Sequence, residues 1–401
     1  MAEHFLHGVE VIELDGGARP IQSVASSVIG LIGTAPKGPV NKPTLILGSL
    51  TEATKIFGED TEGYTIPAAL KGIFDQAGAI VVVVNVADPD NESHLDGEGN
   101  LDPQKIALSD IVGGVNAEGS YRGAKCLLAA QTECKVQPRL IVAPGFTHQR
   151  PQGNANPVVA ELLGIAERLR AIVIADCPNG TKEEAVSYRE DFGSPRLFCA
   201  YPWAKVFKND EAVEEPFSAR IAGLIAKSDN EKGFWWSPSN SVINGIVGIS
   251  KPVDFTLGDP NCVANFLNEN KVATIIQQDG FRLWGNRTTS ADAKWCFISV
   301  RRTADMINDS LLRAHLWAVD RNITKTYVED VCEGVNNYLR YLKNIGAVIG
   351  GKCWADASLN TPDQVQQGKI AFDFDFTPPY PAEHITFRSR LVNDYLEEIF
   401  E

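Results

Sequence analysis

The sequence predicts a multi-domain protein of mixed α/β and α+β class. We expect a mostly parallel α/β middle domain, a mixed-sheet domain built from N- and C-terminal parts, and extended terminal arms. The chain has 401 residues, which is more than one ordinary hydrophobic core accommodates. Short apolar runs alternate with helical stretches between residues 79 and 250, as in a parallel sheet covered by helices. After residue 251 the pattern changes to a hairpin followed by amphipathic helices.

The composition is that of a folded, acidic protein. Hydrophobic residues make up 44% and charged residues 22%, while 37 Lys and Arg against 51 Asp and Glu give a net charge of −14. Phosphate backbones and anionic lipids repel such a chain, so we expect no direct nucleic-acid binding and no membrane insertion. The eight cysteines form no C-x-x-C pair, which favours buried, reduced thiols over a disulfide framework or a zinc site. The first residues lack the pattern of a secretory signal.

The N-terminal residues predict an extended arm. Phe5, Val9 and Val11 favour a strand, and Asp15-Gly16-Gly17 ends it. A lone strand is not stable in water, so this arm must pair with a sheet edge of its own chain or of another. Two short strands, Val24–Ile32 and Pro43–Leu47, and a helix over about 66–77 follow.

The middle of the chain predicts strands that are buried on both faces and separated by helices. The strands are Ile80–Val86, Leu140–Ala143, Ile172–Ala175 and Leu197–Tyr201. The helices cover about 120–131, 157–170, 182–190 and 217–227. The polar stretch Asp88–Asp102 is expected to form an exposed loop at a domain junction.

The C-terminal part predicts a hairpin, two helices and a strand. Val272–Ile276 and Phe281–Trp284 flank a turn, and apolar stripes with 3,4 spacing predict helices over about 304–318 and 328–345, with Gly346 after the second. Between 370 and 376 apolar residues alternate with Ala and Asp, as in a half-buried antiparallel strand. Ile385 and Phe387 resume the alternation beyond three prolines, and residues 391–400 resemble a helix.

The motifs of nucleotide, metal and hydrolytic sites are missing from the sequence. Gly33 and Gly38 have the spacing of a phosphate loop, but Pro39 replaces its lysine. The acidic residues between 88 and 102 do not have EF-hand spacing, and Asp373 and Asp375 fit the solvent face of a strand better than a catalytic pair. There is no G-x-G-x-x-G, H-E-x-x-H or G-x-S-x-G motif. We therefore expect no catalytic residue, cofactor or metal ion.

One polar helix face near the C-terminus can be interpreted in two ways. Asn336, Arg340 and Lys343 lie at 4,3 spacing away from the apolar stripe of the second helix. A basic face on an acidic chain can dock an acidic partner, and an ordinary solvated helix face is the alternative.

Several motifs occur in the order found in one known family. They are Asn344–Asp356, Asn360-Thr361-Pro362, Gly368-Lys369-Ile370, Asp373–Pro379 and Pro381-Ala382-Glu383. This C-terminal third resembles the end of contractile phage tail sheath proteins, including the sheaths of R-type pyocins. Phe5–Val11 and Ser26–Ala35 resemble the start of that family, whereas residues 96–250 match only in their pattern.

The resemblance implies a structural role. Subunits of this family stack as hexameric rings around a tail tube, their terminal arms add strands to neighbouring sheets, and contraction drives the tube through a bacterial envelope. The implied partners are other copies of the chain, the tail tube protein, and baseplate and tail terminator proteins. The implied location is the virion tail, assembled in the bacterial host cytoplasm.

The resemblance also implies a division of the chain. Residues 1–22 would be a strand-donating arm, residues 23–95 and 251–380 an inner sheath domain, residues 96–250 a variable outer domain, and residues 381–401 a C-terminal arm. The expected arm contacts between subunits are Phe5, Val9, Val11, Phe372, Phe374, Phe376, Ile385 and Phe387, and the expected tube-facing residues are Asn336, Arg340 and Lys343.

Simple energetics support side-chain burial as the source of arm affinity. A backbone hydrogen bond contributes about 0.5–1.5 kcal/mol net, and ordering one residue costs about 1–2 kcal/mol. Burial of apolar arm residues, about 1.5–3 kcal/mol each, must therefore stabilise the contact. Because no phosphate loop accompanies the resemblance, we expect the work of contraction to come from a metastable assembly and not from nucleotide hydrolysis.

Two alternatives remain open at the level of the sequence. The chain could serve a pyocin or secretion-type contractile device instead of a phage. It could also be an α/β enzyme whose catalytic domain is formed by residues 79–250, with a ligand pocket at the carboxyl ends of the strands.

Overall fold

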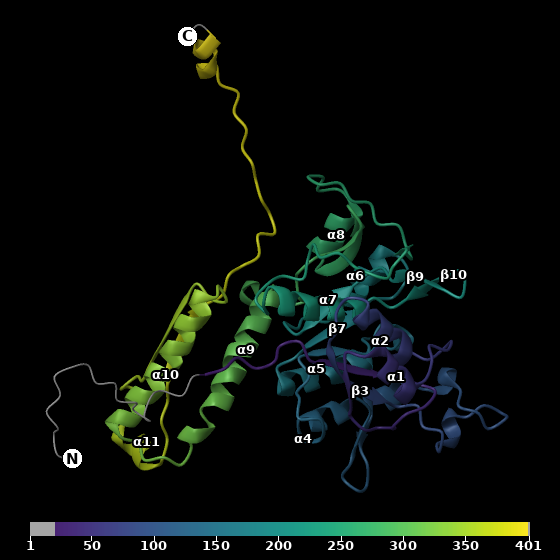
Figure 1. Ribbon diagram of the computed structural model, residues 1–401, viewed down its shortest axis with the longest axis horizontal. Coiled ribbons are helices and arrows are strands. Elements are labelled where there is room, and N and C mark those ends of the chain that lie inside the picture. The colour runs from purple at the N-terminus through teal and green to yellow at the C-terminus, as the bar shows by residue number, and fades with distance from the viewer. Residues whose placement is uncertain (1–20, 400–401) are drawn as a thin grey trace, which may run out of the picture.

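The structure is a computed structural model that describes residues 21–399, and it divides into a large body and a C-terminal unit (Figure 1). The body contains a central sheet with helices on both faces. The C-terminal unit consists of two long helices and a two-stranded sheet, from which the last residues extend away as an arm (Figure 1).

The central sheet has eight strands and is largely parallel. Its order is β13 (Phe281–Trp284), β12 (Val272–Gln277), β8 (Leu197–Ala200), β7 (Ile172–Asp176), β6 (Leu140–Val142), β1 (Ile29–Gly33), β3 (Ile80–Asn85) and β2 (Thr44–Leu47). Only the outermost strands, β13 and β2, pair antiparallel with their neighbours. The predicted mixed α/β class with a mostly parallel sheet is therefore confirmed, and so is the predicted hairpin.

Two apolar cores explain why the inner strands are hydrophobic on both faces. On β1, Ile29 and Leu31 face one core, and Ile32 faces the other, together with Val28 just before the strand. The first core is covered by α1 (Leu50–Phe57), α2 (Ile66–Phe74) and α7 (Ser218–Glu231). The second is covered by α3 (Leu108–Val112), α4 (Ala130–Glu133), α5 (Pro157–Leu169), α6 (Lys182–Glu190) and α8 (Val263–Glu269).

The body also contains two smaller sheets. β9 (Ala204–Lys208), β10 (Glu211–Glu215) and β11 (Gly248–Ile249) form a three-stranded sheet, and β4 (Gly114–Val115) pairs with β5 (Tyr121–Arg122). The prediction of a helix over 120–131 was wrong in part. Residues Gly123–Ala129 form a 3₁₀ helix, and only α4 is α-helical. Gly123 has φ 59°, and its turn packs directly on the backbone of Asp110 and Ile111, which a regular helix start would not allow.

A fully buried carboxylate links β7 to α7. Asp176 ends β7 and accepts hydrogen bonds from the backbone N–H groups of Phe217, at 2.6 Å, and Ser218, at 2.7 Å. Burial raises the pKa of Asp176 to about 6, although these hydrogen bonds oppose the shift.

The C-terminal unit follows the predicted pattern closely. It contains α9 (Ile298–Ala314), α10 (Lys325–Asn344), β14 (Gly350–Trp354), α11 (Pro362–Gln366) and β15 (Asp373–Thr377). Thr324 caps the start of α10, and Gly346, at φ 83°, turns the chain after its end. β14 and β15 pair antiparallel and pack on α10.

The predicted domain boundaries at residues 95 and 250 run through one continuous sheet instead of separating two. β1, β2 and β3 precede residue 95, and β12 and β13 follow residue 250, yet all five belong to the same sheet as β6, β7 and β8. The sequence placed these strands approximately, since the strand predicted over Val24–Ile32 begins only at Ile29, but the order in which distant strands pair depends on packing.

The predicted elements at the C-terminus differ from the structure. Ile385 and Phe387 lie in an extended segment that pairs with no strand among the described residues. Asp394–Ile399 form a 3₁₀ turn and not an α-helix. Ile385, Phe387, Tyr395 and Leu396 are exposed within the part of the chain that the structure describes, and tertiary packing supplies most of the stability of short elements.

Candidate functional site

A row of arginines lies along one edge of the central sheet. Arg139 directly precedes β6, Arg170 ends α5 just before β7, and Arg196 directly precedes β8. The parallel register pairs Leu140 with Ile172 and Val173 with Leu197. The amino ends of the three strands therefore meet at the same edge and bring the three guanidinium groups together.

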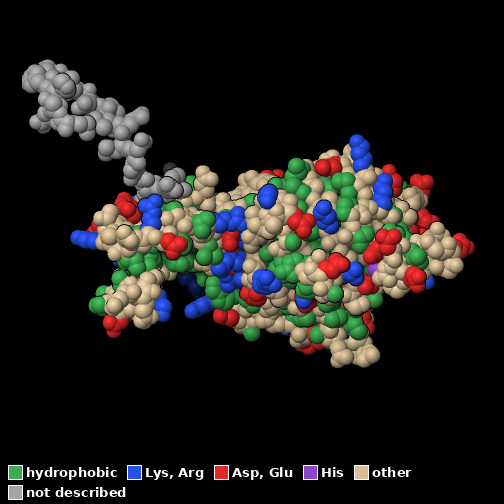
Figure 2. Space-filling view, turned by 90° about the horizontal axis from the view of Figure 1, so that it is seen from below, with side chains coloured by type: hydrophobic (Ala, Val, Ile, Leu, Met, Phe, Trp, Pro, Cys, Tyr) green, Lys and Arg blue, Asp and Glu red, His purple; other side chains and the backbone are tan. Residues whose placement is uncertain are grey.

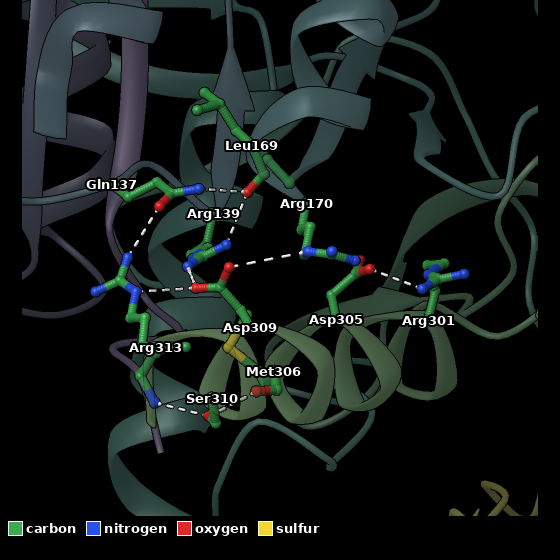
Figure 3. Close-up of polar contacts among 12 residues, drawn as sticks. Gln137, Arg139, Leu169, Arg170, Arg301, Asp305, Met306, Asp309, Ser310 and Arg313 are labelled. Carbon is green, nitrogen blue, oxygen red and sulfur yellow. Dashed lines mark hydrogen bonds and ion pairs between the residues drawn. The ribbon is translucent and has the colours of Figure 1, made fainter. Parts of the chain in front are cut away.

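α9 lies across this edge and supplies the opposite charges (Figure 3). Asp309 forms ion pairs with Arg139, with Arg170 at 3.8 Å (Nε to Oδ1) and with Arg313 at 3.2 Å (Nε to Oδ2). One helical turn earlier, Asp305 accepts hydrogen bonds from Arg196 Nη1 at 2.6 Å and Nη2 at 3.0 Å.

Two further contacts extend the cluster. Arg301, on α9 itself, donates to Asp305 Oδ1 at 2.7 Å, and Glu167 of α5 lies 2.9 Å from Arg196 Nε. Because residues at i and i+4 lie on one helix face, Asp305 and Asp309 both face the strand edge that carries the arginines. Figure 2 shows the Lys and Arg side chains that gather where the C-terminal unit meets the body.

These charges are buried and depend on one another. Arg196 is 5% exposed and Asp305 only 1%. Burial alone would lower the pKa of Arg196, but the hydrogen bonds and the charge of Asp305 outweigh burial and raise it. For Arg139 burial dominates and lowers the pKa, although Asp309 opposes this. Removing one partner would leave an uncompensated buried charge.

A further buried ion pair ties α9 to α7. Arg302 donates to Asp229 of α7, with Nη1 at 2.8 Å and Nη2 at 2.5 Å from the carboxylate oxygens. Arg302 also donates to the backbone oxygen of Ser26 at 3.1 Å, and Ser26 Oγ donates to Asp229 at 2.6 Å. α9 is thus fixed to the body through the edge of the central sheet and through α7.

The predicted phenylalanine strand packs on its own chain. Phe374 and Phe376 are half-buried in β15 and contact the core formed by Tyr338 and Leu342 of α10. Phe372 lies at the same face, next to the cluster of Val335 and Leu339. This packing accounts for one face of the strand, and a contact of these residues with a neighbouring subunit stays a prediction.

Asn336 has a role that its helix position did not reveal. Its Nδ2 donates to the backbone oxygen of Cys353 at 3.0 Å, and its Oδ1 accepts from the Cys353 N–H at 2.8 Å. The amide thereby replaces a neighbouring strand at this point of β14. The structure engages the polar atoms of Asn336 with β14, and the contact of this residue with a tube stays a prediction.

Arg340 and Lys343 lie on the exposed face of α10, near its C-terminal end. Arg340 donates to Asn337 in the preceding turn, and neither basic residue forms an ion pair within the part of the chain that the structure describes. Tyr341 beside them is 51% exposed. Their contact with a tube stays a prediction.

The first residues of the C-terminal arm contact the body, and the residues beyond them are exposed. Arg287 Nε donates to Glu383 Oε1 at 2.8 Å, and the ring of Tyr380 contacts Phe297 edge-on at 6.3 Å between centroids. Further along, Phe387 is 93% exposed and Leu391 is 100% exposed, and Ile385 is also exposed. The arm residues Phe5, Val9 and Val11 lie outside the described residues.

One open hollow lies in the loops that follow β3. Its volume is about 460 Å³, and its polar lining includes Asp88, Asn116 and Arg122. Within residues 21–399 no three His, Cys, Asp or Glu side chains gather as metal ligands would. No helix of this range is long and apolar enough to cross a membrane.

Family models match most of the chain. Residues 26–86 match the tail sheath protein Gp18 domain III N-terminal region, residues 119–289 the phage tail sheath protein central domain, and residues 290–391 the phage tail sheath C-terminal domain.

Full-length relatives agree with the family models. A prophage major tail sheath protein of Pseudomonas aeruginosa (strain UCBPP-PA14) is 44% identical, over 99% of both chains. The tail sheath protein of Escherichia phage P2 is 34% identical, over 98% of this chain and 97% of the relative.

Solved structures share the fold at lower identity. The helical sheath of the anti-feeding prophage in its contracted state matches with a TM-score of 0.70 at 22% identity, covering 96% of this chain and 99% of that chain. The sheath complex of the extracellular contractile injection system PVC, also contracted, matches with a TM-score of 0.69 at 17% identity, covering 98% and 99%.

These matches confirm the resemblance found in the sequence and decide against the α/β enzyme, which was the alternative from another class of protein. The chain belongs to the contractile phage tail sheath protein family and is a structural, non-enzymatic sheath subunit of a contractile tail or injection system.

Proposed function

We propose that the chain polymerises as stacked hexameric rings around a tail tube and contracts to drive that tube through a bacterial envelope. The observation that carries this proposal is the C-terminal arm, whose apolar residues Ile385, Phe387 and Leu391 are exposed in the single chain. Exposed apolar segments of this kind indicate an interaction site. The similar structures named above are a helical sheath and a sheath complex, which supports self-assembly.

The arms are proposed to add strands to the sheets of neighbouring copies. β14 and β15 form a sheet of only two strands within the described part of the chain, so both of its outer edges face away from a paired strand. Such edges template the addition of an extended segment, and side chains buried on one face provide most of the affinity. We assign the inter-subunit contacts to Phe5, Val9, Val11, Phe372, Phe374, Phe376, Ile385 and Phe387.

This proposal is tested by the double variant Ile385→Asp/Phe387→Asp. Both side chains are exposed in the single chain, so its thermal unfolding should match that of the wild type. Negative-stain microscopy should show tubes or rings for the wild type and only single particles for the variant. Normal tubes from the variant would contradict the role of the arm.

We further propose that α10 faces the tube through Arg340 and Lys343, with Asn336 on the same helix engaged on β14. Exposed ion pairs contribute only about 0–1 kcal/mol each, which suits a contact that must break during contraction. The charge reversal Arg340→Glu/Lys343→Glu should prevent polymerisation on purified tubes while leaving the chain folded. Normal assembly of this variant on tubes would exclude the contact.

Residues 1–22 and 381–401 are proposed as arms. Residues 23–95 with 251–380 are proposed to lie near the axis of the particle and 96–250 near its outside, although the two regions share one sheet. Electron cryo-microscopy of the assembled particle would measure the radius of each segment directly.

The energy for contraction is proposed to reside in the assembled lattice. Sheath subunits can repack as rigid bodies between two states, and the ion pairs around α9 support rigid movement of the body with its C-terminal unit. Contraction of purified particles should therefore proceed without added ATP. An absolute requirement for ATP would overturn this proposal.

The proposed location is the virion tail, assembled in the cytoplasm of the bacterial host, and the further partners are baseplate and tail terminator proteins. One of the similar structures is a baseplate of the anti-feeding prophage, which supports contact with a baseplate. A pyocin or secretion-type device remains the second candidate, because relatives come from both a phage and a prophage. Neighbouring capsid and terminase genes would identify a phage.

A further inference from the structure

We propose that Cys332 and Cys353 form a disulfide between α10 and β14 when the chain meets an oxidising medium, and that this bond locks the two-stranded sheet onto α10. Both thiols are free in the structure. The inference concerns the single chain, so it does not depend on the function proposed above.

The Cys353 side chain points toward α10. In the antiparallel register Cys353 lies opposite Phe374, and residues directly opposite each other project from the same face of a sheet. Phe374 packs against the apolar residues of α10. Cys353 is only 3% exposed and lies in the same buried cluster. Its thiol is therefore enclosed between the two-stranded sheet and the helix.

Cys332 lies on the face of α10 that this sheet covers. Cys332, Val335 and Leu339 recur at 3,4 spacing, which places them on one helix face. Val335 and Leu339 are buried in the cluster that contains Cys353, and Cys332 packs against it. Asn336, which follows Cys332 by one helical turn, binds both backbone groups of Cys353. These bonds fix β14 beside Cys332, so the two thiols meet where α10 contacts β14.

The surroundings of the two thiols give them different roles. Burial raises the pKa of the Cys332 thiol, and a hydrogen bond with Cys353 opposes this shift. Burial, followed by the charge of Cys332 and the hydrogen bond with it, raises the pKa of Cys353 to about 12. Only an ionised thiol attacks a disulfide. Cys332 is half-buried whereas Cys353 is buried, so Cys332 is the thiol that a small oxidant reaches first.

The oxidant is a small-molecule disulfide such as oxidised glutathione. The Cys332 thiolate attacks one of its sulfur atoms, which forms a mixed disulfide and releases one glutathione thiolate. The Cys353 thiolate then attacks Cys332 Sγ, which forms the bond between the two cysteines and releases the second glutathione thiolate. The two cysteines lose two electrons to the oxidant, and their two protons end on the two glutathione thiolates.

A second pair of thiols in the body provides an internal comparison. Cys177 directly follows β7, and Cys199 lies in β8 opposite Ala175, so both cysteines project from the same face of the central sheet. A hydrogen bond with Cys199 adds to burial in raising the pKa of Cys177. Both side chains are 0% exposed. This pair shares the proximity of the first pair but not its accessibility, so we expect it to stay reduced in the folded chain.

The disulfide would change how β14 is held. In the reduced chain, the Asn336 amide and side-chain packing attach β14 to α10. A bond between residues 332 and 353 closes the loop between them and removes conformations in which β14 leaves the helix. A bacterial cytosol keeps thiols reduced, whereas the medium outside a cell allows disulfides to form. The lock is therefore open in a reducing compartment and closes outside it.

Peptide mapping of the full-length chain tests the bond. The reduced protein is incubated with oxidised glutathione, its remaining thiols are alkylated, and it is digested without a reductant. Mass spectrometry should find the peptides of Cys332 and Cys353 joined within one chain, while Cys177 and Cys199 react with the alkylating agent only after denaturation. Cys332→Ser should abolish the bond. Cys134→Ser, which removes another half-buried thiol, is the matched control and should leave the bond intact.

Hydrogen exchange tests the lock. Exchange of the Cys353 amide should be at least about tenfold slower in the oxidised wild type than in the reduced wild type, because the bond suppresses local opening of β14. The oxidant should not change this rate in Cys332→Ser, and in Cys134→Ser it should slow exchange as in the wild type.

Several results would overturn the inference. Free thiols at Cys332 and Cys353 after oxidation, a lasting mixed disulfide of Cys332 with glutathione, or a link from Cys332 to another chain would each show that the pair does not form the bond. A bond that forms without slowing exchange at Cys353 would show that it does not act as a lock. The joined peptides together with slower exchange support the inference.

Discussion

The body and the C-terminal unit treat their sheet edges in opposite ways. At the edge of the central sheet the segment 240–243 hydrogen-bonds to β13, through Asn240 N–H to Leu283 O at 2.6 Å and Ile243 N–H to Phe281 O at 2.8 Å. β15 has no such cover among the described residues. At the β13 edge the body completes the hydrogen bonding with its own chain, whereas the β15 edge and the C-terminal arm stay uncovered among the described residues. We therefore expect folding stability to reside mainly in the body and assembly to depend on the C-terminal unit.

The largest expected effect is on the free energy of unfolding, and it should differ between one substitution in the body and one in the C-terminal arm. Phe198 is fully buried in β8, so Phe198→Ala should lower the free energy of unfolding of the single chain by about 3–5 kcal/mol. Phe387→Ala, in the exposed arm, should change it by less than about 0.5 kcal/mol and weaken tube assembly instead. Urea unfolding below the assembly concentration measures both. A strong loss of monomer stability in Phe387→Ala would break the comparison.

The next effect concerns the junction between the regions. Asp305→Ala removes the buried carboxylate that binds both Nη atoms of Arg196 and leaves this arginine only the exposed Glu167, so we expect the free energy of unfolding to fall by about 3 kcal/mol. Arg313→Ala is the matched control, because the Arg313 side chain is 47% exposed and its ion pair with Asp309 should contribute less than about 1 kcal/mol. Equal effects of the two substitutions in urea unfolding would show that burial does not control this junction.

The pH dependence of folding stability should come in part from Asp176, which is buried in the body. The pKa of Asp176 is raised from 3.8 to about 6, so the folded state binds this proton more tightly than the unfolded state. The contribution of Asp176 to stability is therefore greatest at low pH and falls as the pH rises from about 4 to about 6. Relative to Asp176→Asn, the wild type should lose about 1–3 kcal/mol between pH 4.5 and pH 7.

Urea unfolding at several pH values measures this difference, and the comparison with Asp176→Asn cancels the titration of other groups. Arm variants such as Phe387→Ala should show the pH profile of the wild type. A difference that grows in favour of the wild type with rising pH would contradict the sign of the shift.

The smallest expected effect tests Asn336. Asn336→Ala removes two hydrogen bonds to the Cys353 backbone and should lower the free energy of unfolding by about 1–2 kcal/mol. Asn337→Ala, at the neighbouring exposed position, is the control and should have almost no effect. Hydrogen exchange at the Cys353 amide should become faster only in Asn336→Ala. Unchanged exchange there would show that the amide does not close this edge.

Local patterns predicted most elements of both regions. The alternation of Phe374 and Phe376 with aspartates predicted a half-buried strand, and the apolar stripe of α10 predicted its helix and the turn at Gly346. These patterns succeed because neighbouring residues in a strand or helix share a face with a fixed period. Helix spacing did not show that β14 returns to that face of α10, where the Cys353 backbone binds the Asn336 amide.

The ion pairs around α9 were not predicted at all. Arg196 and Asp305 are 109 residues apart, and Arg139 and Asp309 are 170 apart. A usable signal was present, since Arg139 and Arg196 each directly precede an apolar strand and the two aspartates are spaced i and i+4. It becomes meaningful only when the strands are known to be parallel and adjacent.

The sequence by itself determined the class of the fold, the positions of most strands and helices, the acidic charge and the family, because periodicity and motif order are local properties of the chain. Only the tertiary structure decided that strands from both sides of residues 95 and 250 form one sheet, that α9 is held by buried arginines, and that Asn336 closes one edge while β15 stays open. Those features depend on which distant segments bury each other's surfaces, and this is determined only when the whole chain packs together.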